Sequence, residues 1–250
     1  MGGYWGNRPE VIGHGGAGGH APGNSRAALD AGLRFGVDRI ECDLRLTADG
    51  DLALVHDASL AGDGGSVAVR TMTNDDLRIR LPGLLLLGEA VELVAGRTPF
   101  MLDLKEADAV PALIAGIRRY GLSDASSVSC RSWPALRRLR AALPGMRLGL
   151  SVGDLAASTP TRRARAVTRK GFRRTLPVWL PHALRRLGAT EVMLSRRMVT
   201  PGIVRAVHRS GKRVNMWTVD DPDDLREAIA SGVDGLITNF PDRARTILGE

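Results

Sequence analysis

Short apolar runs alternate along the chain with longer stretches whose apolar residues recur at helical spacing. This alternation predicts parallel strands joined by crossover helices. The predicted strands are Glu10–His14, Asp38–Leu44, Pro99–Lys105, Ser126–Cys130, Met146–Ser151, Glu191–Ser195, Arg213–Val219 and Asp234–Thr238. The clearest predicted helices are Ser25–Phe35, Ala107–Tyr120, Trp133–Ala142, Pro201–Ser210 and Pro222–Ser231.

Eight strands in this order predict an α/β fold, a (β/α)₈ TIM barrel. The chain has 250 residues, which is the usual length of such a barrel, so we expect one domain spanning residues 1–250. A turn signal at Ala48-Asp49-Gly50 precedes a further short run at Asp51–Val55. It predicts a hairpin on the second barrel strand, and therefore a small insertion after strand 2.

Two stretches exceed a minimal barrel. Residues 57–86 form an excursion that contains glycine and aspartate, and residues 152–190 carry nine lysine or arginine side chains around Trp179 and Pro181. The basic stretch fits a solvated pair of helices that closes the barrel. It also fits a lid or a surface that faces lipid, so peripheral contact with anionic lipid stays open.

The overall charge favours anionic ligands without choosing among them. The formal net charge is +8, and hydrophobic residues make up 44% of the chain, enough for a large core. Aromatic residues are only 4%, with no basic and aromatic side chains interleaved as stacking platforms, so no nucleic acid partner is expected. Met1 to Pro9 lacks the apolar segment of a signal peptide, and Cys42 and Cys130 cannot build a disulfide framework. These features predict a cytoplasmic protein, and they leave the oligomeric state open.

Carboxylates stand at strand positions that are otherwise apolar. Residues two apart in a strand share a face, so Glu41 and Asp43 point the same way, as do Asp103 and Lys105. Carboxyl ends of barrel strands converge on the active-site face. Buried neighbouring carboxylates need a cation to remain ionised, and an all-oxygen set suits one divalent cation, Mg²⁺ or Ca²⁺.

Two histidines lie at strand ends on the same presumed face. His14 ends the first strand and His56 follows Leu54-Val55. Such a pair can activate an attacking oxygen and protonate a leaving one near neutral pH. His20, His182 and His208 are interpreted as structural or surface residues, with His208 on a helix surface. The glycines that follow His14 could let backbone amides approach a phosphate, a weak signal by itself.

These residues resemble the glycerophosphodiester phosphodiesterase family. The family pattern has His-Arg-Gly after the first strand, a Pro-Glu-Asn loop, a Glu-x-Asp strand, a Thr-x-Asp-Gly turn and a His-Asp pair. Most of it occurs in order between Val11 and Asp57. The third strand, Phe100 to Lys105, and the last two strands, Val214–Val219 and Gly232–Pro241, look like those of the family as well. Residues 106–190 match only in their order of elements.

The resemblance implies metal-dependent hydrolysis of glycerophosphodiesters to an alcohol and glycerol phosphate, with a small-molecule phosphodiester as substrate. Carried over by position, it implies metal ligands at Glu41, Asp43 and Asp103, and acid/base histidines at His14 and His56. The implied substrate contacts are Lys105, Trp217 and, in the glycine-rich loop, Gly15.

Three positions depart from the family pattern. Gly15 replaces an arginine, which removes a bidentate phosphate donor, Gly23 replaces the loop glutamate, and Asp103 replaces a glutamate, as in the related spider-venom sphingomyelinases D. Two further hypotheses stand beside the first. The basic segment at 162–186 suggests a phospholipase D or lysophospholipase D acting on lipid, and Gly15 and Gly23 suggest an impaired barrel that only binds phosphodiesters.

Overall fold

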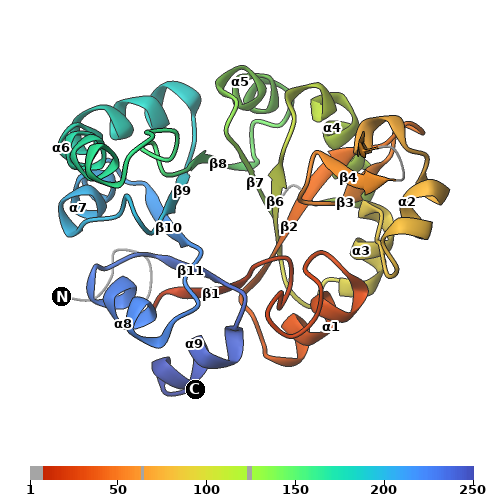
Figure 1. Cartoon of the computed structure of the whole chain (residues 1–250), viewed down its shortest axis with the longest axis horizontal. Coiled ribbons are helices and arrows are strands. Elements are labelled where there is room, and N and C mark those ends of the chain that lie inside the picture. Colours follow the sequence, from red (N-terminus) through yellow and green to blue (C-terminus); the bar gives the residue numbers. More distant parts are fainter. Residues whose placement is uncertain (1–7, 63–64, 123–125) are drawn as a thin grey trace.

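Eight parallel strands close into a barrel in the computed structural model, which describes residues 8–62, 65–122 and 126–250 (Figure 1). The barrel strands are β1 (Glu10–Gly13), β2 (Arg39–Leu46), β6 (Phe100–Leu104), β7 (Ser127–Cys130), β8 (Arg147–Val152), β9 (Glu191–Ser195), β10 (Arg213–Trp217) and β11 (Gly235–Thr238). Each pairs with its neighbours in chain order, and β1 pairs with both β11 and β2, which closes the ring. The prediction of a (β/α)₈ TIM barrel is confirmed.

Helices surround this barrel on the outside (Figure 1). They are α1 (Arg26–Arg34), α3 (Leu87–Val94), α4 (Val110–Tyr120), α5 (Trp133–Ala142), α6 (Arg162–Leu187), α7 (Pro201–Arg209), α8 (Pro222–Ala230) and α9 (Pro241–Leu248). The predicted start signals act as expected, because the side chains of Thr200 and Asp221 accept hydrogen bonds from the first turns of α7 and α8. Helices α3 and α9 were not among the predicted ones.

The insertion after β2 is larger than one hairpin strand. Strand β3 (Leu52–Leu54) pairs antiparallel with β2, as predicted. The following excursion folds into a second hairpin of β4 (Ser59–Gly62) and β5 (Gly65–Ala68), then the short helix α2 (Asn74–Arg80). It has its own small apolar cluster around Val69 and Leu77, which stabilises this insertion beside the barrel.

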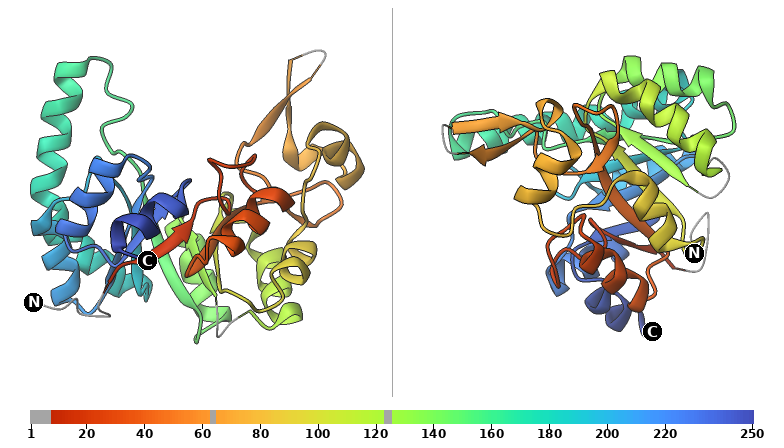
Figure 2. Two further views of the ribbon diagram at one scale, coloured as in Figure 1. Left: turned by 90° about the horizontal axis from the view of Figure 1, so that it is seen from below. Right: turned by 90° about the vertical axis from the view of Figure 1, so that its right-hand side faces the viewer.

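The basic stretch at 152–190 forms one long helix, and the predicted pair of helices is wrong. Helix α6 runs for 26 residues through Pro177 and Pro181. Its carboxyl-terminal half packs on the barrel through Leu176, Leu180 and Leu184, whereas no side chain before Leu176 is buried. The first half therefore projects beyond the barrel, on the same side as the β4–β5 hairpin (Figure 2, left).

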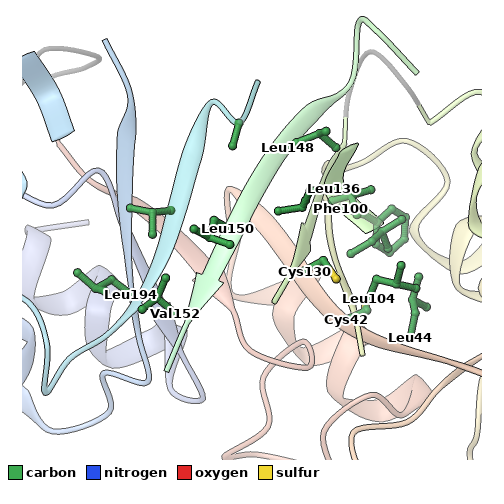
Figure 3. Packing of buried hydrophobic residues seen from close by; sticks show 14 of the residues in the cluster. Cys42, Leu44, Phe100, Leu104, Cys130, Leu136, Leu148, Leu150, Val152 and Leu194 are labelled. Carbon is green, nitrogen blue, oxygen red and sulfur yellow. The ribbon is translucent and has the colours of Figure 1, made fainter. Parts of the chain in front are cut away.

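The core lies between the strands and the helices. Alternation along β2 places Ile40, Cys42 and Leu44 toward the helices, in the main apolar cluster (Figure 3). Both cysteines are buried and unpaired, as expected of small apolar residues. The opposite face of β2 carries Arg39 and the candidate carboxylates into the barrel interior, so the same alternation that builds the core also builds the site.

His208 does not lie on the surface of its helix: it is mostly buried against Asp234, whose Oδ2 is 2.8 Å from His208 Nε2. Of the segment Met1 to Pro9, which lacks the apolar pattern of a signal peptide, only Arg8 and Pro9 belong to the described residues. Within the described ranges, none of the helices combines the length and the hydropathy needed to cross a bilayer.

Candidate active site

Three carboxylates from two adjacent strands meet inside the barrel. Parallel pairing of β2 with β6 sets Asp43 directly beside Asp103, and Glu41 lies two residues earlier on the same face. One oxygen from each of the three lies within 4.8 Å of the others. Such an all-oxygen set can hold a hard divalent cation.

Burial places these carboxylates in electrostatic conflict. Burial itself and the negative charge of Asp43 raise the pKa of Glu41 well above its usual range. For Asp43, burial opposes ionisation, but the charge and hydrogen bond of Lys105 outweigh it and lower the pKa. Asp43 Oδ1 lies 2.5 Å from Lys105 Nζ. The site therefore holds more negative charge than its one lysine balances.

Lys105 bridges the carboxylates of the two strands β2 and β6. Its Nζ is 2.5 Å from both Asp43 Oδ1 and Asp103 Oδ2. Burial alone would lower the pKa of Lys105, but the charges of Asp103, Asp43 and Glu41 raise it above the ordinary value. The ammonium group is thus positively charged throughout the physiological range.

Neighbouring side chains fix the orientation of each carboxylate. Asp103 Oδ1 accepts hydrogen bonds from the hydroxyls of Ser129 (2.5 Å) and Ser151 (3.0 Å), on β7 and β8. Asn24 donates to Asp43 Oδ2 (2.7 Å) and accepts from the Asp43 backbone amide (3.0 Å). These contacts hold the carboxylates in one geometry, as is typical of the groups around metal ligands.

His14 is held by a chain of hydrogen bonds from the end of the last strand. Its Nδ1 lies 2.8 Å from Asn239 Oδ1, and the Asn239 amide donates to Asp220 (2.7 Å). Because the amide group of Asn239 is used by Asp220, its carbonyl oxygen faces His14. Nδ1 is therefore the protonated nitrogen, and Nε2 is left to accept a proton.

His56 is more exposed, with 66% of its side chain accessible to solvent. Its Nδ1 lies 2.8 Å from Asp57 Oδ1, a contact that orients the ring. Its backbone carbonyl accepts a hydrogen bond from Arg45, which also pairs with Glu106. Both contacts of Arg45 are therefore with the protein, at the His56 carbonyl and the Glu106 carboxylate.

Both histidines border two cavities. The first, of about 60 Å³, is lined by the candidate residues except Asp43 and Gly15, together with Arg131. Trp217 lines it as the family resemblance implies, with Arg131 Cζ 5.9 Å from its ring centroid. The second, of about 210 Å³, lies on the side of the glycine-rich loop. His14 and His56 therefore line both hollows, next to the metal-compatible carboxylates.

Gly15 and Gly23 line the second cavity. Gly15 has φ +53°, and a Cβ there would lie 2.9 Å from the Asn24 amide nitrogen, so this backbone strongly favours glycine. Its amide donates to Glu41 Oε2 (2.9 Å). Gly15 therefore acts on a carboxylate through its backbone, whereas the space beside Gly23 is open.

Several polar residues of the site carried no signal strong enough to single them out. They lie at or just after strand ends, or in the loop after β1, and are Asn24, Ser129, Arg131, Ser151, Asp220 and Asn239. Position after a strand is the signal that could have found them. Their partners are 18 to 225 residues away along the chain, so the pairings themselves are not readable from spacing.

Comparison with known proteins agrees with the fold. The glycerophosphoryl diester phosphodiesterase family matches residues 14–83 and 87–243. A Mycobacterium tuberculosis protein named "probable glycerophosphodiester phosphodiesterase 2" is 31% identical over 91% of this chain and 85% of its own length. The solved glycerophosphodiester phosphodiesterase of Agrobacterium tumefaciens has a TM-score of 0.73 and 25% identity, covering 95% of this chain and 99% of its own.

An Oleispira antarctica phosphodiesterase, solved in complex with the product sn-glycerol-3-phosphate, has a TM-score of 0.79 at 20% identity, with 97% and 98% of the two chains covered. Fold, site and relatives together define a phosphoric diester hydrolase built on a TIM barrel. The chain belongs to the glycerophosphoryl diester phosphodiesterase family.

Proposed function

We propose that this chain, as one catalytic domain, hydrolyses glycerophosphodiesters to an alcohol and glycerol phosphate with the help of one divalent cation, Mg²⁺ or Ca²⁺. The observation that carries the proposal is the meeting of Glu41, Asp43 and Asp103 within 4.8 Å, with His14 and His56 lining the adjoining cavities. The product seen in the Oleispira relative supports glycerol phosphate as the common half of the substrate. We place this activity in the cytoplasm.

The residues fit a cation on chemical grounds. All three ligands are carboxylate oxygens, and burial together with the neighbouring charge of Asp43 raises the pKa of Glu41, which a cation in the site would relieve. A bound divalent cation would polarise a phosphoryl oxygen and stabilise the charge of the transition state. Lys105, already charged, would contact the same phosphate.

The two histidines divide the proton transfers. His14 has Nε2 available as an acceptor because Asn239 uses its Nδ1, so it is suited to deprotonate the attacking oxygen. His56, beside Asp57, is suited to carry the proton that the departing alcohol needs. Trp217 and Arg131 line the opening and would bind the rest of the substrate.

Chelation of divalent ions is expected to stop turnover. Charge stabilisation by a cation contributes several kcal/mol, which corresponds to about 10³-fold in rate. The assay follows alcohol release from glycerophosphocholine, glycerophosphoethanolamine and glycerophosphoglycerol with Mg²⁺, Ca²⁺ or Mn²⁺, before and after EDTA. Asp43→Asn should lose the response to metal. Turnover that is unchanged by EDTA contradicts the proposed metal dependence, whereas binding without any turnover supports the alternative of an impaired phosphodiester-binding barrel.

The projecting half of α6 favours a second feature, contact with anionic lipid. Between Leu155 and Thr190 the chain has no acidic residue. The unburied half of α6 is 14 residues long, or about 21 Å. Helix α6 exposes one face at helical spacing, made of Arg163, Val167, Lys170 and Arg174 in this half and Val178 just beyond it.

The composition of this face matches an interfacial helix. Val167 and Val178 are 68% and 78% exposed, and the exposed bases Arg163, Lys170 and Arg174 form no ion pair within the described part of the chain. Apolar side chains among bases bind the boundary of an anionic bilayer. Because α6 projects on the carboxyl-end side of the barrel (Figure 2), such contact would turn the active site toward the membrane.

Charge reversal on this face is expected to abolish vesicle binding. Each base near an anionic surface contributes about 1 kcal/mol, so Arg163→Glu, Lys170→Glu and Arg174→Glu together should weaken binding at least about 100-fold. Co-sedimentation with vesicles of phosphatidylglycerol and phosphatidylcholine at low salt measures it. A matched variant reverses three exposed arginines of α5 and α7, namely Arg137, Arg138 and Arg205. Equal losses in both variants, or no sedimentation of the unaltered protein, rule out this surface.

A further inference from the structure

A groove adjoins the catalytic cavity on the side of α5 and α6. It measures about 350 Å³ and is open to solvent, and Arg131 and Ser151 line both hollows. Ser151 also donates a hydrogen bond to Asp103. The groove therefore begins at a residue that contacts one of the proposed metal ligands and runs outward from there.

The walls of the groove are mainly apolar. Leu150 and Val152 from β8 line the groove, and Trp133 on α5 and Trp179 on α6 line it as well. Trp133 is 38% exposed, and a large aromatic side chain left in water beside an active site is typical of a ligand contact. All three tryptophans in the described residues, Trp133, Trp179 and Trp217, line this groove or the catalytic cavity.

Charge is distributed unevenly along the groove. Arg131, at the junction, is exposed and forms no ion pair within the described ranges. Asp154, the carboxylate in the lining, is neutralised by Arg169 at 2.6 Å. A positive group at the catalytic end and apolar walls beyond it fit an amphiphile whose anionic end points toward the carboxylates.

We infer that this groove binds the single alkyl or acyl chain of a lipid phosphodiester whose phosphate lies between Arg131 and the carboxylate site. The inference rests on the proposed function and names its substrate class. A cavity of this size holds a ligand of drug size, which admits one chain. In the reaction, water oxygen bonds to phosphorus, the bond from phosphorus to the head-group alcohol breaks, and the departing oxygen takes a proton. The products are the chain-bearing phosphate monoester and the head-group alcohol.

The first test is a series of monoacyl glycerophosphocholines with acyl chains of increasing length, assayed below their critical micelle concentrations. Working with monomers separates the groove from any binding of α6 to a surface. A half-buried methylene should raise kcat/KM about twofold, which gives about 60-fold from butanoyl to decanoyl. Glycerophosphocholine, without a chain, is the reference substrate.

A variant that fills the groove should remove this dependence. A Cβ at Gly153 would meet the Arg131 guanidinium no closer than 3.8 Å, and the backbone there is not left-handed, so Gly153→Phe can be accommodated. Its ring would occupy the path of the chain and flatten the length dependence to within about threefold. Gly145→Phe is the matched control, since a Cβ there has no atom within 4 Å and the turn lies at the opposite end of the barrel.

The outcomes distinguish the groove from the enzyme. Hydrolysis of glycerophosphocholine with a flat length series overturns the groove and leaves the proposed function standing. If no phosphodiester is hydrolysed, the groove can still be tested by binding. Tryptophan fluorescence then measures the affinity for decylphosphocholine below its critical micelle concentration. Gly153→Phe should weaken that binding at least tenfold and Gly145→Phe should not. Equal binding by both variants overturns the inference.

Discussion

Replacement of either His14 or His56 by alanine is expected to lower kcat about 10²- to 10⁴-fold, the usual contribution of a positioned acid or base. His14 has its Nε2 available because its Nδ1 is hydrogen-bonded to Asn239, which in turn donates to Asp220. His56 borders both cavities and pairs with Asp57. Removing either imidazole leaves one proton transfer without a partner, so the loss should appear in kcat for a soluble glycerophosphodiester at saturating metal.

The fold should survive both substitutions, since neither side chain belongs to the apolar core. Thermal unfolding within a few degrees of the unaltered protein checks this. His182→Ala is the matched control, because His182 is exposed on α6 and lines neither catalytic cavity. A near-normal rate in His14→Ala or His56→Ala contradicts the assigned role of that histidine.

The orientation of His14 supplies a further distinction within the same experiment. Asn239→Ala removes the hydrogen bond to Nδ1 but keeps the imidazole. We therefore expect an intermediate loss of kcat and a changed pH profile, because the ring is no longer held in one tautomer. A variant rate equal to that of His14→Ala would mean that Asn239 is needed for more than positioning.

The barrel and its carboxylates follow from local pattern. Alternation in Glu41-Cys42-Asp43 decides which side chains face inward, and the order of strands decides that β2 lies beside β6. Both rules act on near neighbours in the chain or the sheet, which is why a single sequence reveals them. They place Asp103 next to Asp43 without any knowledge of distances.

The helix α6 shows where local pattern fails. Pro177 and Pro181 each remove a backbone donor, which favours a break between two helices. Buried Leu176, Leu180 and Leu184 nevertheless follow helical spacing through both prolines and pack on the barrel. Tertiary burial thus outweighs the local penalty, and only the assembled barrel supplies that burial.

The polar residues that orient the site could not be predicted from the sequence for a different reason. Asn239 follows the last strand and His14 ends the first, and closure of the barrel brings them to 2.8 Å. Their separation of 225 residues leaves no periodic signal. The same holds at the other end of the barrel, where Arg39 meets Glu191 across 152 residues.

Arg39→Met is expected to destabilise the fold by about 3–5 kcal/mol, the usual cost of leaving one buried charge without its partner. Arg39 shares the inward face of β2 with Glu41 and Asp43 but lies at the opposite end of the barrel, with 2% exposure. It pairs with Glu191, whose side chain is fully buried, and with Glu10. Urea unfolding followed by circular dichroism measures the change.

The pH dependence of this loss has a defined sign. Burial opposes ionisation of Glu191, but Arg39 and Arg147 outweigh it and lower the pKa of Glu191 to about 2. A carboxyl group with a lowered pKa stabilises the fold above its unfolded pKa of about 4.3, and this contribution disappears as pH falls through about 2. Without Arg39 the pKa of Glu191 rises, so this carboxyl group is neutralised at a higher pH than in the unaltered protein. The difference in free energy of unfolding between the unaltered protein and Arg39→Met should therefore narrow from pH 5 toward pH 3.

A double variant separates the lost charge pair from lost packing. Arg39→Met with Glu191→Gln removes both charges and should recover most of the stability, since a neutral pair leaves no uncompensated buried ion. Arg147→Met is the single control, because Arg147 is 36% exposed and lies 3.5 Å from the same carboxylate. Two results would contradict a stabilising ion pair at this end of the barrel. One is a free energy of unfolding of Arg39→Met within about 1 kcal/mol of that of the unaltered protein. The other is a double variant that is no more stable than Arg39→Met.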